Sequence, residues 1–170
     1  MERWSDLMAD ALKQSGVRMV AHVPDEVTGH LLDRLSADPE LRVVSCTREE
    51  EGVAVLAGGY LGGRKGALVL QGSGLGNSLN ALGSLAIAYQ IPMLLIISER
   101  GRLGEFNPAQ VPLGRAIPRI LDALGIQFFS INDPEEIGDV VAGASDLAFG
   151  GLVPVALGLS TRLTGGKTLR

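Results

Sequence analysis

The sequence places three consecutive glutamates in the segment Thr47-Arg48-Glu49-Glu50-Glu51-Gly52-Val53-Ala54, at the start of an expected helix. The free backbone amides and the positive dipole end of a first helical turn favour acidic side chains, which explains Glu49 and Glu51 without a further role. Glu50 differs because apolar residues follow it three, four and seven positions later, along one helical stripe. We therefore expect Glu50 to point toward packed structure, where its perturbed proton affinity would suit it to proton chemistry.

A second distinctive segment, Gln71-Gly72-Ser73-Gly74-Leu75-Gly76-Asn77, follows an apolar strand and precedes a helix expected from Asn77 to Tyr89. A Gly-rich turn in that setting is typical of phosphate binding. The segment departs from the dinucleotide fingerprint, because Asn77 stands where the third glycine should be and no acid for a ribose lies near position 92. Nucleotide binding is thus weakly supported, and a non-catalytic nucleotide-binding or regulatory module remains the alternative to an enzyme.

Length and composition favour a single domain with an aliphatic core. The chain has 170 residues, of which 46% are hydrophobic and only 4% aromatic, as in buried parallel sheets. The net charge of -4 comes from 15 basic and 19 acidic residues without a basic run, which argues against an extended nucleic-acid interface. Cys46 is the only cysteine, so an internal disulfide and a multi-cysteine metal site are excluded.

No charged residue occurs between Lys65 and Glu99, but polar residues and Pro92 divide this stretch into pieces of strand, helix and strand length. We therefore expect no membrane span. The N-terminal segment lacks the long apolar core of a signal peptide, which favours a cytoplasmic protein. The uncharged helix from Leu79 to Tyr89 should be covered on several sides, by the sheet and by another domain or subunit.

Short apolar runs alternate with helical patterns along the chain, which predicts an α/β fold. Because parallel neighbours need crossover connections, the alternation indicates a doubly wound, six-stranded, mainly parallel sheet with helices on both faces. Asp133-Pro134-Glu135-Glu136 is a strong helix start, with a capping Asp, Pro at the first helical position and acids in the first turn. The expected strands are residues 19–23, 41–46, 67–70, 93–98, 126–131 and 153–157.

Ligands of such sheets bind beyond the carboxyl ends of the strands. That rule selects His22 with Asp25, the glutamate triplet, the Gly-rich segment, residues 99–102 and Asn132 as the predicted rim of a site. The domain is expected to span residues 1–162, with a tail from Leu163 to Arg170. The long loop from Glu99 to Pro118 carries three prolines and three glycines, and loops of that length are usually lids, binding loops or disordered segments.

The segment Arg48-Glu49-Glu50-Glu51-Gly52, with Gly59-Tyr60 reaching ten positions beyond Glu50, resembles the pyrimidine-binding domain of thiamine-diphosphate enzymes. In that superfamily the corresponding helix begins with an essential glutamate and carries a Gly-Tyr pair two to three turns later. The chain is most similar to the decarboxylases of sulfopyruvate and phosphonopyruvate. The similarity extends from Val23-Pro24-Asp25 to Gly114-Arg115, and only the predicted tail lies outside it.

The resemblance implies a carboxy-lyase acting on a small anionic 2-oxo acid such as sulfopyruvate or phosphonopyruvate. It assigns Glu50 to the aminopyrimidine of thiamine diphosphate, where a shared proton activates the cofactor, and places Gly72, Ser73, Gly74 and Asn77 beside it. The diphosphate is held elsewhere in the family, through Mg²⁺, by a Gly-Asp-Gly segment and a downstream pair of asparagines. This chain contains no Gly-Asp-Gly. The resemblance therefore implies a hetero-oligomer with a beta, diphosphate-binding subunit.

A distal sulfonate or phosphonate needs a guanidinium partner, because the Arg fork matches its oxygens. Most exposed arginines belong to the solvated surface, yet only the long loop offers several near the rim. We choose Arg115 first and Arg102 second as substrate ligands. His22 is a further candidate for substrate contact, although an ordinary strand-end role is more common. No His, Cys or carboxylate grouping in the sequence has convincing metal-ligand spacing.

Overall fold

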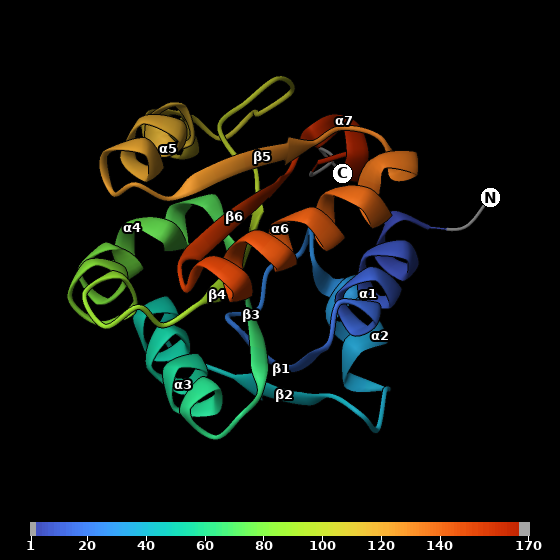
Figure 1. The fold of residues 1–170 in the computed structure, drawn as a ribbon. Coiled ribbons are helices and arrows are strands. Elements are labelled where there is room, and N and C mark those ends of the chain that lie inside the picture. The colour runs from blue at the N-terminus through green and yellow to red at the C-terminus, as the bar shows by residue number, and fades with distance from the viewer. Residues whose placement is uncertain (1–2, 167–170) are drawn as a thin grey trace.

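A computed structural model of the chain describes residues 3–166 and contains one six-stranded sheet (Figure 1). Every neighbouring pair of strands is parallel, and the spatial order is β2-β1-β3-β4-β6-β5. All residues of β4 and β6 are buried, which explains why these strands read as apolar runs in the sequence. The strands are β1 Val17–His22, β2 Arg42–Ser45, β3 Lys65–Gln71, β4 Met93–Ser98, β5 Gln127–Ile131 and β6 Pro154–Leu159.

Helices cover both faces of the sheet, as predicted (Figure 1). On one face lie α1 Trp4–Gln14, α2 Gly29–Ser36 and α6 Ile137–Gly151. On the other lie α3 Glu49–Leu61, α4 Gly72–Ala81, the π-helix η1 Leu82–Ile87 and α5 Val111–Ala123. Short elements complete the chain, namely η2 Pro108–Gln110, η3 Pro134–Glu136 and α7 Thr161–Thr164. The doubly wound fold class is therefore confirmed.

Strand order reverses between β1 and β3, because the chain leaves β1 toward β2 and then crosses back to β3. In doubly wound sheets the crevice for ligands lies at such a reversal, beyond the carboxyl ends of the strands. Asp25 follows β1 closely, and Gln71 is the last residue of β3. The topology thus brings two polar residues distant in sequence to the predicted site.

Several predicted boundaries were wrong in ways that matter for the site. Helix α4 begins at Gly72, so the Gly-rich segment forms its first turns and not a loop before Asn77. The long connection ends at Asn107, because η2 and α5 occupy most of the stretch predicted as loop up to Pro118. The prolines favoured a loop in the sequence analysis, but both belong to α5. Pro112 occupies the first turn, where proline is tolerated, and Pro118 lies inside the helix. Pro24-Asp25 is expected from the sequence to open the second helix, but α2 begins at Gly29, which leaves Asp25 outside it.

Other predicted features agree with the structure. Asp133 forms a capping box with Glu136 at η3, directly before α6. Pro154 is the first residue of β6, the position that a central strand tolerates. The boundary between domain and tail, in contrast, stays a prediction, and it falls inside α7, where Leu163 is buried in the core. Residues 167–170 of the predicted tail lie outside the described residues.

Candidate functional site

The glutamate triplet occupies the first turn of α3, directly after the sequence leaves β2. Glu49 is the buried member, with 9% of its surface exposed, and its Oε2 accepts a hydrogen bond of 2.9 Å from Asn77 Nδ2. The expected packing of Glu50 was therefore wrong by one position. The inward stripe of α3 runs through Glu49, Val53 and Leu56, whereas Ala54 is exposed. Exposing the small Ala54 costs little, so the apolar pattern alone could not fix the rotation of the helix.

Glu50 is only partly covered, with 37% of its side chain exposed, and its Oε1 accepts a 2.6 Å bond from Arg48 Nε. This bond to Arg48 lowers the pKa of Glu50, opposite to the effect expected from apolar neighbours. Oε2 is shielded from solvent and has no hydrogen-bond partner. The carboxylate thus keeps one oxygen uncommitted at the helix start, although buried polar oxygens are usually paired.

The Gly-rich start of α4 lies directly against α3. A side chain on Gly74 would collide with the carboxylate of Glu49, and Asn77 holds the same carboxylate from the next turn. Gly72 fits closely against Ser98 O of β4. The glycines therefore permit close helix packing, and Glu49 joins the first turn of α3 to the start of α4.

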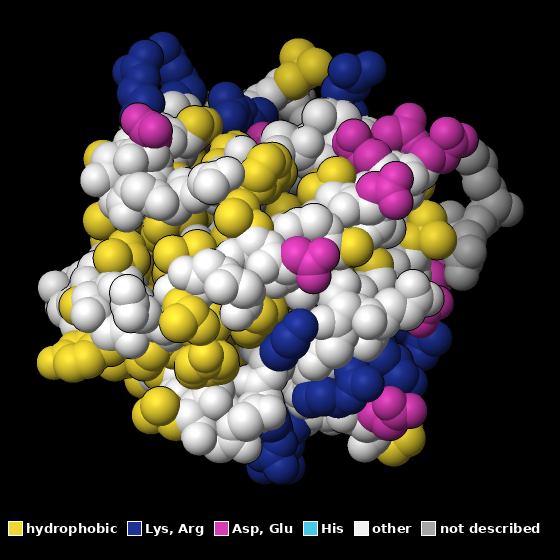
Figure 2. All heavy atoms as spheres, in the orientation of Figure 1, with side chains coloured by type: hydrophobic (Ala, Val, Ile, Leu, Met, Phe, Trp, Pro, Cys, Tyr) yellow, Lys and Arg dark blue, Asp and Glu magenta, His cyan; other side chains and the backbone are white. Residues whose placement is uncertain are grey.

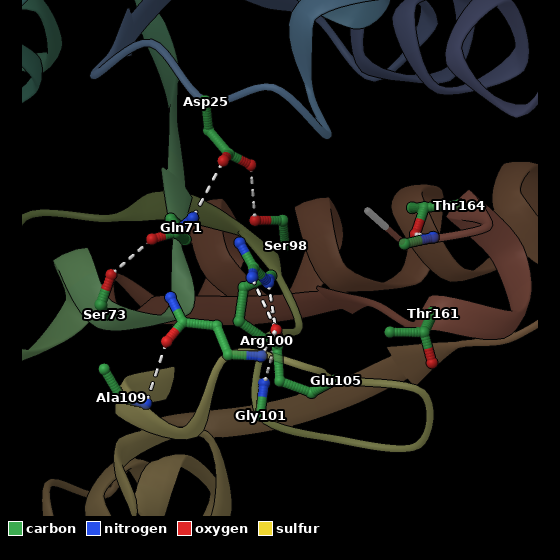
Figure 3. A network of polar contacts seen from close by, with 12 residues as sticks. Asp25, Gln71, Ser73, Ser98, Arg100, Gly101, Glu105, Ala109, Thr161 and Thr164 are labelled. Carbon is green, nitrogen blue, oxygen red and sulfur yellow. Dashed lines mark hydrogen bonds and ion pairs between the residues drawn. The ribbon is translucent and has the colours of Figure 1, made fainter. Parts of the chain in front are cut away.

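A chain of hydrogen bonds crosses the reversal point of the sheet (Figure 3). Ser73 Oγ donates to Gln71 Oε1 at 2.6 Å, and Gln71 Nε2 donates to Asp25 Oδ1 at 2.9 Å. Ser98 Oγ donates to the other Asp25 oxygen at 3.0 Å. Gln71 and Ser98 are register partners on β3 and β4, so Asp25 joins the ends of three adjacent strands. The predicted rim therefore contains a group of polar side chains that hydrogen bonds hold in place.

A second polar cluster organises the connection after β4 (Figure 3). Glu105 accepts bonds from Arg100 Nε at 2.6 Å and Arg100 Nη2 at 2.8 Å, and both side chains are almost completely buried. The bond from Arg100 holds the pKa of Glu105 at about 2, well below its usual range. Burial and the fork geometry make this pair the most strongly held charge pair at the rim.

The three predicted substrate ligands lie in different settings. Arg102 is at the rim, 38% exposed, with its Nε 3.4 Å from Glu99 Oε2. Arg115 is exposed on α5, one residue after the buried Gly114, and so projects from a helix instead of the predicted loop.

His22 lies on the other side of the sheet. Its register partner Val69 belongs to the core under α1, α2 and α6, whereas α3 and α4 cover the opposite face. Burial lowers the pKa of His22, and its Nδ1 lacks a hydrogen-bond partner. The structure therefore brings Glu49, the neighbour of Glu50, against the Gly-rich segment, but it does not bring His22 there.

Gln71 and Arg100 belong to the predicted rim, but sequence analysis missed Ser98 and the pairing of Arg100 with Glu105. Ser98 could have been found, because it is the polar residue that ends an apolar run, as Gln71 is in the adjacent strand. The pairing of Arg100 with Glu105 leaves no such signal, since two residues five apart in a loop have no regular spatial relation.

Neither a metal cluster nor a membrane span is found in the described part of the chain. Within residues 3–166, no group of three or more His, Cys, Asp and Glu side chains could hold a metal ion. Among the helices of the same residues, none is both long and apolar enough to cross a membrane.

The fold and rim define a class of protein: a doubly wound α/β domain with an acidic helix start packed beside a Gly-rich helix start at the carboxyl edge of the sheet. Residues 2–106 match the family model described as thiamine pyrophosphate enzyme, N-terminal TPP binding domain. The chain belongs to this family of thiamine-diphosphate enzymes, which confirms the resemblance drawn from its sequence.

Curated relatives show which members of the family the chain is similar to. The chain is 43% identical over 153 residues to the sulfopyruvate decarboxylase subunit alpha of Methanococcus maripaludis, covering 90% of this chain and 92% of that protein. It is 41% identical over 155 residues to the subunit of the same name from Methanocaldococcus jannaschii, covering 91% and 92%. A phosphonopyruvate decarboxylase of Streptomyces viridochromogenes is 40% identical over 130 residues, covering 76% of this chain but 32% of that protein.

A solved structure supports the fold alone. A 2-oxoglutarate:ferredoxin oxidoreductase from Magnetococcus marinus superimposes with a TM-score of 0.76, covering 96% of this chain and 29% of that chain. At 15% identity this likeness extends to the arrangement of helices and strands and not to the chemistry.

Proposed function

We propose that this chain is the alpha, pyrimidine-binding subunit of a thiamine-diphosphate-dependent decarboxylase of a small anionic 2-oxo acid, sulfopyruvate or a similar compound such as phosphonopyruvate. The observation that carries the proposal is the uncommitted, shielded Oε2 of Glu50 at the head of α3, beside the Gly-rich start of α4. The curated names of full-length relatives support an enzyme over a non-catalytic nucleotide-binding or regulatory module.

The residues at this rim fit the pyrimidine end of the cofactor. Thiamine diphosphate, when bound, supplies the electron sink for loss of carbon dioxide from a 2-oxo acid. Glu50 would hold or share a proton with the ring through Oε2, because Arg48 occupies Oε1. Glu49, Asn77 and Gly74 keep the α4 start close enough to form the adjoining wall.

Mg²⁺ and the diphosphate would be held by a partner, the beta subunit, in a hetero-oligomer. The sequence offers no Gly-Asp-Gly for that task. Figure 2 shows hydrophobic side chains gathered on the side of the molecule where α3 and α4 lie. Leu61 at the end of α3 is 79% exposed and Tyr89 after η1 is 72% exposed, which supports this side as the contact. Because oligomers tend to be symmetric, we expect an assembly larger than one alpha–beta pair.

The substrate's distal anion would be bound near the connection after β4. Arg115 and Arg102 remain the proposed ligands, because both are exposed arginines on the segment that follows β4. Arg100 does not suit this role, since Glu105 already engages two of its nitrogens.

Calorimetric titration tests the proposed subunit role. The purified chain should bind little or no thiamine diphosphate with magnesium, and adding the co-expressed beta chain should restore binding and decarboxylation of sulfopyruvate or phosphonopyruvate. A panel of 2-oxo acids, including pyruvate, identifies the preferred substrate. Tight cofactor binding and turnover by this chain alone would contradict the proposed division of the site.

A further inference from the structure

The carboxylate of Glu105 closes the segment Arg100–Asn107, here called the 100–107 loop, into a ring (Figure 3). It accepts the two guanidinium bonds from Arg100 at one end of the loop. It also accepts hydrogen bonds from the backbone amides of Gly101 and Asn107, each at 3.0 Å. One side chain that is 3% exposed thus collects four donors from both ends of the same loop. Charge-assisted bonds of this kind, away from water, hold their partners strongly.

Two further contacts fix the ring to the rest of the domain. Thr161 Oγ1 of α7 donates to Leu103 O at the loop tip, at 2.9 Å. At the base, Gly114 of α5 lies so close to Arg100 O that a side chain at 114 could not fit. The cavity left between the loop and α7 has a volume of about 240 Å³. The loop therefore has supports at its base, middle and tip, although it contains no regular secondary structure.

The ring sets the position of a candidate substrate ligand. Arg102 lies inside it, between the amide of Gly101 that Glu105 binds and the Leu103 carbonyl that α7 binds. The loop base adjoins the start of α4, since Gly72 faces both Ser98 O and Arg100 N. Glu105 itself is buried and so acts on the rim only through the loop.

We propose that Glu105 is a positioning residue, which fixes the 100–107 loop and with it Arg102, whose Nε lies 3.4 Å from Glu99 Oε2, before a substrate arrives. This inference rests on the proposed function, because it assigns the loop to recognition of an anionic 2-oxo acid. A loop ordered in advance does not lose conformational freedom on binding, so substrate is bound more tightly.

The first test compares Glu105→Gln with wild type in the assembled complex with the partner chain. Glutamine keeps the shape but loses the charge and one of the acceptors. We expect KM for the preferred anionic substrate to rise ~10-fold or more, the scale of a misplaced binding element, with a smaller change in kcat. Hydrogen exchange of the amides in the 100–107 loop should accelerate, while exchange in β3 and β4 stays slow.

Glu40→Gln is the matched control. It also breaks an ion pair, between Glu40 and Lys13, but that pair is exposed and lies before β2 at the opposite edge of the sheet. KM and loop exchange should equal the wild-type values in this variant.

A second variant addresses the risk that a single change leaves Arg100 buried without a partner and unfolds the domain. The double variant Arg100→Met with Glu105→Leu removes both charges, and such apolar replacements are often tolerated. It should melt near the wild-type temperature yet show the same rise in KM and loop exchange, because Gly101 and Asn107 have lost their acceptor.

Wild-type KM and loop exchange in both variants would overturn the proposal, and so would acceleration of exchange throughout the sheet. The converse pattern is expected for Glu50→Gln, namely lost turnover with unchanged loop exchange. If the wild-type complex decarboxylates no 2-oxo acid, the proposed function fails, and loop exchange still decides whether Glu105 orders the loop.

Discussion

Two neighbouring regions of the rim differ in how far the hydrogen-bonding capacity of their carboxylates is used. At the head of α3, Glu50 keeps one shielded oxygen without a partner. In the 100–107 loop, Glu105 has four donors from its own segment. The difference indicates that Glu50 can accept a hydrogen bond from a group outside the chain, whereas Glu105 already has its donors within the chain. Only the first region should therefore change when the partner and cofactor bind.

The largest effect should come from removing the open carboxylate. Glu50→Gln keeps the shape but cannot share a proton in the same way, so we expect kcat to fall by about 10² to 10⁴-fold, the usual range for acid–base groups. Steady-state kinetics of the complex measure the loss. Glu49→Gln and Glu51→Gln should cost far less, because Glu49 contacts Asn77 and Glu51 bonds to Thr47. Equal losses in all three variants would show that Glu50 has no special role.

Adding a methyl group to the glycine that packs against each region compares the rigidity of the two regions. Gly114→Ala should destabilise the fold by about 3 kcal/mol or more, because the methyl meets the backbone of Arg100, which cannot move aside. Gly74→Ala should cost only about 1–2 kcal/mol, since it meets the side chain of Glu49. Urea unfolding monitored by circular dichroism gives both values. A larger loss for Gly74→Ala would reverse the proposed order of rigidity.

Arg115→Ala should raise KM about tenfold for a sulfonated substrate and less for pyruvate, which lacks the distal anion, given the usual strength of a charged hydrogen bond. Arg119→Ala, an exposed position one turn further along α5, is the control and should leave both KM values unchanged. Equal effects on both substrates would leave Arg115 with a structural or gating role. Arg102→Ala should show the same selectivity.

The smallest effect concerns pH. The folded-state pKa of Glu105 is about 2, below the ordinary 4.5. Its contribution to stability is therefore complete above the ordinary value and is lost as pH falls toward 2. Loop exchange, corrected for its intrinsic pH dependence, should stay protected from pH 7 to 5 and lose protection only in stronger acid. Loss of protection near pH 6 would indicate that another group holds the loop.

The sequence predicted the sheet well because burial on both faces demands apolar runs, and Met93–Ser98 was placed without error. It failed for the rotation of α3, since adjacent helix positions differ by about 100° and the small Ala54 fits either side. The pairing of charged groups within the 100–107 loop could not be predicted from the sequence either. Loop contacts depend on backbone geometry that no periodic pattern records, as the pairing of Arg100 with Glu105 demonstrates.

The strand order has a consequence for how the chain folds during its synthesis. Strand β4 pairs with β6 on one side, but β5 and α6 are made before β6. Until Pro154–Leu159 emerges, the strand Met93–Ser98, which is apolar up to Ile97, has an unpaired edge. Pairing between segments that are distant along the chain is slow, and exposed apolar strands aggregate. Slower translation of α6 should therefore lower the yield of native chain more than slower translation of α1.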